Sequence, residues 1–210
     1  KRRRVPASSG HTRSVPEYDR RTALLVVDVQ HDFADPVGSL YIRGAEEIVP
    51  IVNGEIAAAV DAGALVVYTQ DWHPESTPHF EKDGGIWPVH CVHDTWGAEF
   101  HADLQVVDGA PVIRKGIGGE DGYSAFSVRD PRSGESWETE LGMLLRDRMT
   151  RRVVICGLTT DYCVVESVSD ARARHLDVDV VTAGIRAVDL RSGDGQRALE
   201  RMRDVGAVLV

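Results

Sequence analysis

Short, mostly apolar runs alternate along the chain with segments in which apolar residues recur every three or four positions. Runs of four or five apolar residues favour β-strands buried on both faces of a sheet. Six such runs occur, at 23–27, 64–68, 111–114, 152–156, 178–182 and 207–210. Spacing typical of helices occurs at 46–62, 137–148, 160–175 and 195–205.

This alternation predicts an α/β fold in three layers, with a six-stranded parallel sheet covered by helices on both faces. Residues 70–109 are rich in His, Pro, Trp and Asp, and we expect mostly loop there. A glycine-rich loop follows at 116–122. No linker or repeat interrupts the pattern, so we expect one domain over 21–210, preceded by a basic arm over 1–20.

The composition agrees with one ordinary globular domain. The chain has 210 residues, of which 42% are hydrophobic and 27% charged. Its net charge of −9 argues against nucleic-acid or anionic-membrane partners, because phosphate contacts need Lys and Arg. No apolar run is long enough to cross a membrane. A small-molecule substrate fits this charge, and a homo-oligomer stays open.

The cysteines and the N-terminus bear on where the protein acts. Three cysteines without paired spacing do not resemble a disulfide framework, so we expect a reducing cytoplasm. The chain begins with four basic residues that no apolar stretch follows, so we expect no secretory signal there. A charged surface arm is the simplest interpretation. An organelle transit peptide and a nuclear signal are the alternatives.

Polar residues follow four of the predicted strands. Asp28 comes after the first strand, Asp71 and His73 after the second, Lys115 after the third and Cys163 after the fourth. Ligands of open parallel sheets bind beyond the carboxyl ends of the strands. We therefore expect these side chains to converge at one site.

A carboxylate and several imidazoles in the long loop suggest a metal site. Asp71 and His73 are two residues apart, and on an extended segment such residues face the same side. Pro74 biases His73 towards the extended conformation. His79 and His90 follow in the same loop, and together these four residues suit Zn²⁺, Fe²⁺ or Mn²⁺.

Spacing alone leaves another interpretation of these residues open. The chain holds eight histidines, so the pattern could also be a scatter of surface histidines. His93 and His101 lie nearby and are alternative ligands.

Cys163 is the candidate nucleophile. It lies in or near the first turn of a helix, just after three residues that cap helices well, Thr159, Thr160 and Asp161. The helix dipole and the free N–H groups there favour a thiolate of lowered pKa and could hold an oxyanion. The alternative is a buried structural cysteine, which suits Cys156 and Cys91.

Asp28 and Lys115 could complete a catalytic set. An unpaired carboxylate at the end of a buried strand is costly, and Lys115 could supply the compensating charge. With Cys163 they form a workable acid, base and nucleophile. A buried salt bridge that caps the sheet is the alternative. Asp32 and Asp35 are better explained as loop-capping groups.

Five segments in this order resemble the nicotinamidase/pyrazinamidase branch of the isochorismatase-like cysteine hydrolases. They are Asp28-Val29-Gln30-His31-Asp32-Phe33, Asp71-x-His73 with His79, Trp87-Pro88-Val89-His90-Cys91, Lys115-Gly116, and Gly157-Leu158-Thr159-Thr160-Asp161-Tyr162-Cys163. The resemblance covers residues 22–210 and implies the strand order 3-2-1-4-5-6. His31 departs from it, because the family usually has Asn there, and so does the basic arm.

The resemblance also implies a role for each site residue. Asp28, Lys115 and Cys163 would be the catalytic triad, and one divalent metal ion would be held by Asp71, His73, His79 and His90. A cis peptide between Leu158 and Thr159 would turn the N–H of Thr159 towards the substrate oxygen, beside the N–H of Cys163. The substrate would contact Phe33, Trp87, Tyr123 and Leu158.

The activity expected from this resemblance is hydrolysis of nicotinamide to nicotinic acid and ammonia, within NAD salvage. Cys163 would form a thioester, and the metal would position the substrate and a water. Two alternatives remain: a cysteine amidohydrolase for another small amide, pyrazinamide-like or acyclic, and a non-catalytic metal-binding or ligand-binding relative.

Overall fold

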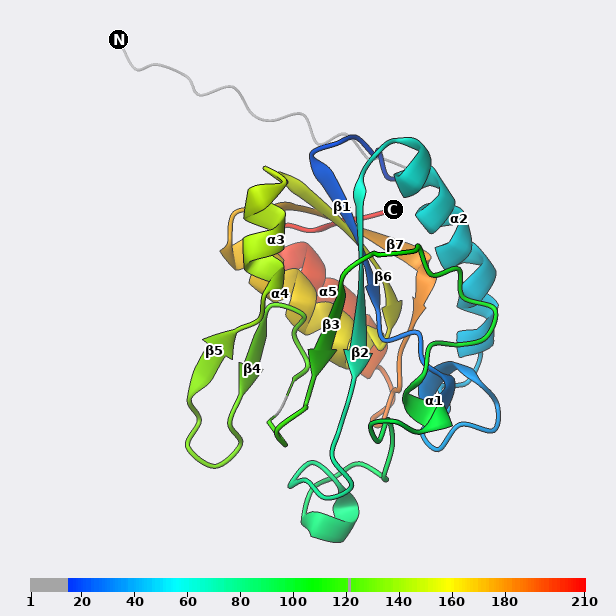
Figure 1. The fold of residues 1–210 in the computed structure, drawn as a ribbon, viewed down its shortest axis with the longest axis vertical. Helices are drawn as coiled ribbons and strands as arrows, with labels where there is room; N and C mark the ends of the chain where they lie inside the picture. The colour runs from blue at the N-terminus through cyan, green and yellow to red at the C-terminus, as the bar shows by residue number, and fades with distance from the viewer. Residues whose placement is uncertain (1–14, 121) are drawn as a thin grey trace.

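The six apolar runs form one parallel sheet in the computed structural model, which describes residues 15–120 and 122–210 (Figure 1). Its strand order is β3-β2-β1-β6-β7-β8, which confirms the predicted 3-2-1-4-5-6 order of the six runs. The strands are β1 (Thr22–Val27), β2 (Leu65–Asp71), β3 (Val112–Lys115), β6 (Arg152–Leu158), β7 (Asp177–Arg186) and β8 (Val208–Leu209). Residues 1–14, most of the predicted basic arm, lie outside the described residues.

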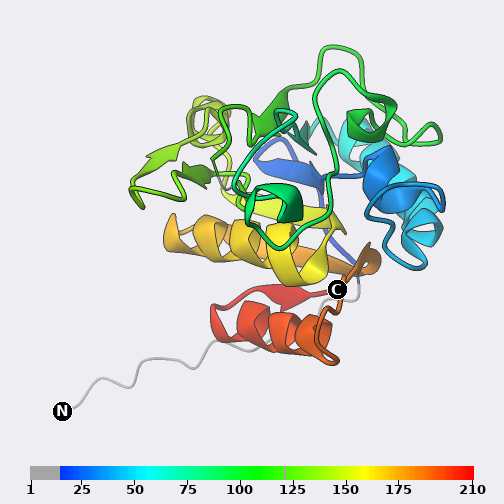
Figure 2. The same ribbon diagram turned by 90° about the horizontal axis from the view of Figure 1, so that it is seen from below.

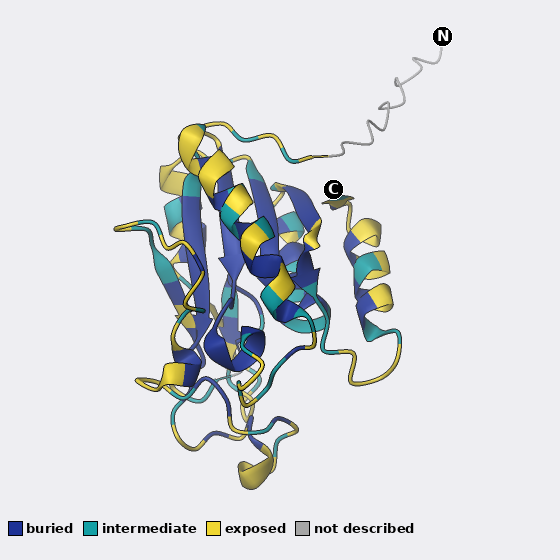
Figure 3. Cartoon of the chain, turned by 90° about the vertical axis from the view of Figure 1, so that its right-hand side faces the viewer, coloured by how far each residue is buried: buried dark blue, intermediate teal, exposed yellow. Residues whose placement is uncertain are grey.

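Helices cover both faces of the sheet, as predicted. One face packs against α1 (His31–Ala34) and α2 (Val49–Asp61). The other face packs against α3 (Leu141–Asp147), α4 (Val165–Ala173) and α5 (Asp194–Asp204) (Figure 2). All six residues of β1 are buried, and alternate residues enter the two cores, which explains its unbroken apolar run. The exposed residues gather on the outer faces of the helices and in the loops (Figure 3).

One predicted helix begins later than its spacing suggested. The stretch 137–148 was expected to be helical, but Trp137 lies in β5 (Ser136–Glu138), paired with β4 (Ser127–Arg129) in an antiparallel hairpin. The hydroxyl of Thr139 donates to the carbonyl of Ala125 at 2.6 Å and accepts the N–H of Leu141 at 3.3 Å. Thr139 therefore ends the hairpin, and α3 begins only at Leu141.

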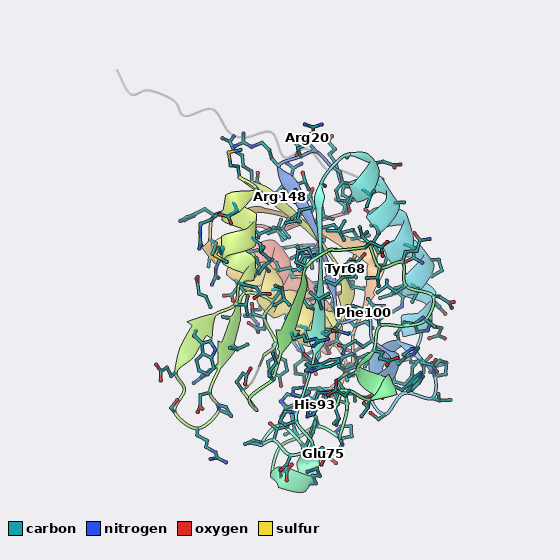
Figure 4. All side chains as sticks on the ribbon, viewed as in Figure 1. Arg20, Tyr68, Glu75, His93, Phe100 and Arg148 are labelled. Atoms are coloured by element: carbon teal, nitrogen blue, oxygen red, sulfur yellow. The ribbon has the colours of Figure 1, made fainter. Side chains whose placement is uncertain are left out.

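The segment between β2 and β3 is mostly loop, as predicted, and lies beyond the carboxyl ends of the strands. It contains two short 3₁₀ turns, Glu81–Asp83 and Trp96–Ala98. Figure 4 labels Glu75 and His93 at this end of the molecule and Arg20 and Arg148 at the other. Within the described residues, no helix has the length and apolar character to span a bilayer.

Candidate active site and metal centre

The polar residues predicted at the strand ends meet in one buried cluster. Asp28 follows β1, Asp71 ends β2 and Lys115 ends β3, while Cys163 lies in a π-helical turn (Thr160–Val164) that follows β6. All four side chains are buried. The parallel topology brings these strand ends to one edge of the sheet, as expected.

Lys115 links the other three residues. Its Nζ donates to Oδ2 of Asp28 at 2.6 Å and contacts Sγ of Cys163 at 3.4 Å. The same Nζ lies 2.9 Å from Oδ1 of Asp71. The lysine is fully buried, so these partners replace the water that would otherwise solvate its charge. Asp71 was predicted only as a metal ligand, and its contact with Lys115 was not foreseen.

Two residues that sequence reasoning missed hold the carboxylates in place. The hydroxyl of Thr69 donates to Oδ1 of Asp28 at 2.5 Å and accepts the N–H of Asp28 at 3.1 Å. The side chain of Gln30 donates to the carbonyl of Asp71 and accepts its N–H, each at 2.8 Å. Gln30 stands in the segment that carried the family resemblance, whereas nothing near Thr69 in the sequence marks it.

Burial and charge set the protonation of the cluster in opposite directions. Burial raises the pKa of Asp28, and Lys115 only partly offsets this effect. Burial also opposes ionisation of Lys115, but Asp28 and Asp71 hold its pKa well above the usual value. The cluster therefore combines a charged ammonium with a carboxylate that accepts a proton more readily than an exposed aspartate does.

The thiol of Cys163 does not follow the expectation of a lowered pKa. Burial raises its pKa well above the usual value, despite the opposing effect of Lys115. The expectation relied on the start of a helix and did not include desolvation, which disfavours the thiolate. Burial therefore favours the neutral thiol, so Cys163 needs a neighbouring base to become a nucleophile.

Three histidines gather beside this cluster. One ring nitrogen from each of His73, His79 and His90 lies within 4.8 Å of the other two, and all three residues are buried. Oδ2 of Asp71 lies 3.8 Å from Nε2 of His73 and 3.9 Å from Nε2 of His90. Asp71 thus points one oxygen towards the histidines and the other towards Lys115.

The donor set suits a divalent metal ion. Neither ring nitrogen of His73 has a hydrogen-bond partner among the described residues, although buried polar atoms nearly always have one. Nδ1 of His90 lies 2.7 Å from the carbonyl of Pro88, which leaves Nε2 for a ligand. Burial lowers the pKa of His90 to about 4, so its ring is neutral at neutral pH, as a metal ligand must be.

The two alternative histidines lie elsewhere. His93 is exposed, and its Nδ1 lies 2.9 Å from Asp94. Nδ1 of His101 accepts the N–H of Asp103 at 3.2 Å. Neither residue belongs to the group of three histidines, so the geometry favours the original assignment.

A pocket opens beside Cys163, His79 and His90. Phe33, Trp87 and Tyr123 line it, as expected. Nε1 of Trp87 donates to the hydroxyl of Tyr123 at 3.0 Å, which fixes two of the aromatic walls. Leu158 does not line the pocket. Its side chain packs fully buried in the core with α2.

Three further pocket residues, Leu40, Tyr162 and Val188, were not predicted. The rings of Trp87 and Tyr162 pack in a T-shaped arrangement with 4.8 Å between their centroids. The carboxylate of Asp161 accepts the N–H of Val188 at 3.0 Å and that of Asp189 at 2.8 Å. These two hydrogen bonds hold the loop after β7 against the turn that carries Cys163.

The peptide bond between Leu158 and Thr159 is cis, which confirms that expectation. Thr159 lines the pocket next to Cys163. The other two cysteines, Cys91 and Cys156, are buried in the core with Leu24 and Val26, as their structural interpretation predicted.

His31 and the loop-capping aspartates lie outside the pocket. The ring of His31 stacks on Trp96 with 4.3 Å between the ring centroids. Asp32 accepts the N–H groups of Ser39 at 3.0 Å and Cys91 at 2.7 Å. Asp35 accepts the N–H of Val37 at 3.0 Å. Both aspartates cap loops, as expected, and the departure at His31 leaves the catalytic cluster untouched.

Comparisons with known proteins agree with this geometry. The isochorismatase domain model matches residues 22–210. The chain is 34% identical to a nicotinamidase of Escherichia coli, over 89% of this chain and 93% of that protein. A pyrazinamidase of Pyrococcus horikoshii in complex with zinc is 36% identical, with a TM-score of 0.81 over 90% of this chain and 98% of that one. The protein PnC1 of L. infantum in complex with nicotinate is 35% identical, with a TM-score of 0.81 over 91% of this chain and 92% of that one.

Proposed function

Since the chain belongs to the isochorismatase domain family, we propose that it hydrolyses nicotinamide to nicotinate and ammonia with Cys163 as nucleophile. The observation that carries this proposal is the placement of Lys115. Its ammonium contacts both Asp28 and Cys163, and Cys163 lines the aromatic pocket. A nicotinamidase relative and a nicotinate-bound structural neighbour support the choice of substrate.

The first chemical step forms a thioester. Asp28 accepts the proton of the Cys163 thiol, which its raised pKa favours, while the Lys115 ammonium stabilises the thiolate that results. The sulfur attacks the carboxamide carbon and forms a C–S bond. As the C–N bond breaks, Asp28 returns the proton to the leaving nitrogen, and ammonia departs.

The second step restores the enzyme. Asp28, again a carboxylate, takes a proton from a water, and the water oxygen attacks the thioester carbon. The C–S bond breaks, Asp28 returns its proton to the sulfur, and nicotinic acid leaves and loses its carboxyl proton to solvent as nicotinate. In both steps the backbone N–H groups of Thr159 and Cys163 would stabilise the oxyanion. Their position at the cis peptide and the π-helical turn supports this assignment.

Asp71, His73, His79 and His90 would hold one divalent ion, which supplies a Lewis acid for a pyridine nitrogen or a water. The zinc-bound neighbour supports Zn²⁺, and the donor set also suits Fe²⁺ and Mn²⁺. The aromatic walls formed by Phe33, Trp87 and Tyr123 would stack against the substrate ring. The described chain from residue 21 onwards would act as one hydrolase domain.

A product assay tests the proposal. The purified protein is incubated with nicotinamide, and the ammonia and nicotinate formed are quantified by two independent methods. The proposal predicts equal amounts of the two products. Activity should fall when a chelator removes the metal and return on readdition of Zn²⁺, Fe²⁺ or Mn²⁺. Pyrazinamide and acyclic amides are assayed in parallel. If only an acyclic amide is hydrolysed, the substrate is wrong, and if none is hydrolysed, the chain is a non-catalytic relative.

We also propose that the enzyme acts in the cytoplasm within NAD salvage. All three cysteines are free, which suits a reducing compartment. The nicotinamidase relative supports the place in NAD salvage.

A further inference from the structure

His73 and His90 are two buried histidines of the proposed metal site. Of these two, His90 has a hydrogen bond that orients its ring and His73 does not. Nδ1 of His90 lies 2.7 Å from the carbonyl of Pro88. His73 has no hydrogen-bond partner at either ring nitrogen among the described residues. Metal-binding histidines usually donate from the second nitrogen to a carboxylate or a carbonyl, which fixes the ring. The ring of His73 must therefore be fixed in another way.

The backbone of His73 is held, and packing surrounds its ring. The N–H of His73 donates to the carbonyl of Cys91 at 2.9 Å, and its carbonyl accepts the N–H of His93 at 2.8 Å. The ring of His73 stacks on the ring of His79 with 4.8 Å between the centroids. It packs in a T-shaped arrangement with the ring of Phe80, with 5.5 Å between the centroids. The backbone bonds leave only the side-chain torsions of His73 to be fixed, and contacts of the ring with its neighbours restrict them.

Gly116 packs against the Nδ1 edge of this ring. A Cβ atom added at Gly116 would overlap Nδ1 and Cε1 of His73. Those atoms belong to a buried ring stacked on His79, so they cannot move aside as the end of a flexible chain could. Gly116 also has a φ of +79°, a backbone conformation that is unfavourable for residues with a side chain.

We propose that Gly116 is a positioning residue of the metal centre, whose lack of a side chain sets the ring orientation of His73. This inference rests on the proposed role of His73 as a metal ligand. The contact occurs where the loop after β3 passes the end of β2. It gives the glycine after Lys115 a function separate from the chemistry of Lys115.

Gly116→Ala tests the proposal, and Gly119→Ala is its matched control. Gly119 lies in the same loop with a φ of +85°, but an added Cβ would only meet Oγ1 of Thr77 at an ordinary 3.6 Å. Both variants carry the backbone strain, and only Gly116→Ala displaces His73. Zn²⁺ affinity is measured by competition with a chromophoric chelator, and bound metal by elemental analysis. Gly116→Ala should weaken binding roughly 10- to 100-fold, as losses around metal ligands do, and Gly119→Ala should not.

A second measurement needs no metal. Thermal unfolding of the metal-free wild type, Gly116→Ala, His73→Ala and the double variant forms a double-mutant cycle. The added methyl should lower Tm in the wild-type background and far less in the His73→Ala background, where the ring is gone. Equal losses of Tm in both backgrounds, or Zn²⁺ affinity of Gly116→Ala equal to that of Gly119→Ala, would overturn the proposal. A wild type that binds no Zn²⁺ would overturn the proposed metal centre instead, while the cycle still decides whether Gly116 positions His73.

Discussion

At the scale of single residues, Asp71 connects two parts of the site that the sequence suggested separately. One of its oxygens faces His73 and His90, and the other lies 2.9 Å from Nζ of Lys115. Burial opposes its ionisation, but Lys115 and then His73 hold its pKa well below the usual range. Asp71 is therefore charged at neutral pH, and it shares the cation that also contacts Asp28.

Replacement of the thiol tests the nucleophile. Cys163→Ala should lower turnover of nicotinamide by at least roughly a thousandfold, because the covalent path needs the sulfur. Cys156→Ala is the matched control, since that buried cysteine lies in β6 with Sγ about 4.0 Å from the carbonyl of Leu25. Steady-state rates and circular dichroism are measured for both. Residual activity of Cys163→Ala at a tenth of the wild-type rate would falsify the covalent mechanism.

The raised pKa of Asp28 predicts the acid side of the pH–rate profile. Asp28 must be ionised to accept the thiol proton, so kcat/KM should fall as pH drops through its pKa. Burial raises that pKa, so the fall should lie above the ordinary aspartate value of about 3.9. Asp28→Asn should lower kcat by roughly 10²- to 10⁴-fold.

The profile needs a control for metal loss. Bound metal is measured at each pH, because protonation of the histidines would release it and mimic the effect. An acid limb at the ordinary aspartate value, with metal retained throughout, would show that another group is the base.

Sequence reasoning identified the site residues that end strands and missed those that act through tertiary contacts. Three charged residues, Asp28, Asp71 and Lys115, lie at or just after the end of a buried strand. A charged side chain at such a position needs a partner or a function, so the sequence alone marks it. Thr69 lies inside β2, where a threonine is ordinary, and only the approach of β1 gives it a role. The lowered pKa expected for Cys163 was wrong for the same reason, because burial depends on the whole fold.

At the scale of elements, the loop after β7 becomes a wall of the pocket because Asp161 holds it. The carboxylate accepts the N–H groups of Val188 and Asp189, and Val188 lines the pocket. Asp161 is two residues from Cys163, so the turn that carries the nucleophile also fixes this wall. The wall and the nucleophile therefore keep their relative position.

Asp161→Ala should loosen that wall. Loss of two backbone hydrogen bonds costs about 1–2 kcal/mol, so KM for nicotinamide should rise roughly 5- to 30-fold with a smaller change in kcat. Asp130→Ala is the control, because Asp130 accepts the N–H groups of Arg132 at 2.8 Å and Ser133 at 2.6 Å in the hairpin. If the two variants have the same KM, the bond from Asp161 does not shape the pocket.

The strands of the sheet were predictable because each contains an apolar run, which in β1 and β6 is buried on both faces. The hairpin of β4 and β5 was not, because all three residues of β5 are exposed and show no burial pattern. The spacing predicts a helix from Trp137 onwards, but Trp137 lies in the hairpin with 47% of its surface exposed. Apolar periodicity detects burial, so it cannot locate an element that is stabilised by hydrogen bonds at the surface.

At the scale of the whole molecule, the proposed metal ligands come from both the sheet and the longest loop. Asp71 ends β2, whereas His79 and His90 lie in the segment between β2 and β3, which has only short turns and isolated bridges. A bound ion would therefore connect parts of the chain that little regular structure connects otherwise. Such an ion stabilises the folded state, because the unfolded chain does not present the ligands together.

Removal of the metal should consequently lower the stability of the fold as well as its activity. Metal at a hundred times its Kd adds about 2.7 kcal/mol, which corresponds to roughly 5–10 °C in Tm for a domain of this size. Chelation should lower the Tm of the wild type and of Cys163→Ala equally, because the thiol is not one of the four proposed ligands. His73→Ala, which lacks a ligand, should start at the lower Tm and respond little to the chelator. Thermal unfolding with and without chelator, together with elemental analysis, measures all three proteins. A wild type that loses its metal without any change in Tm would mean that the long loop is held by its own packing, and that the ion serves the substrate alone.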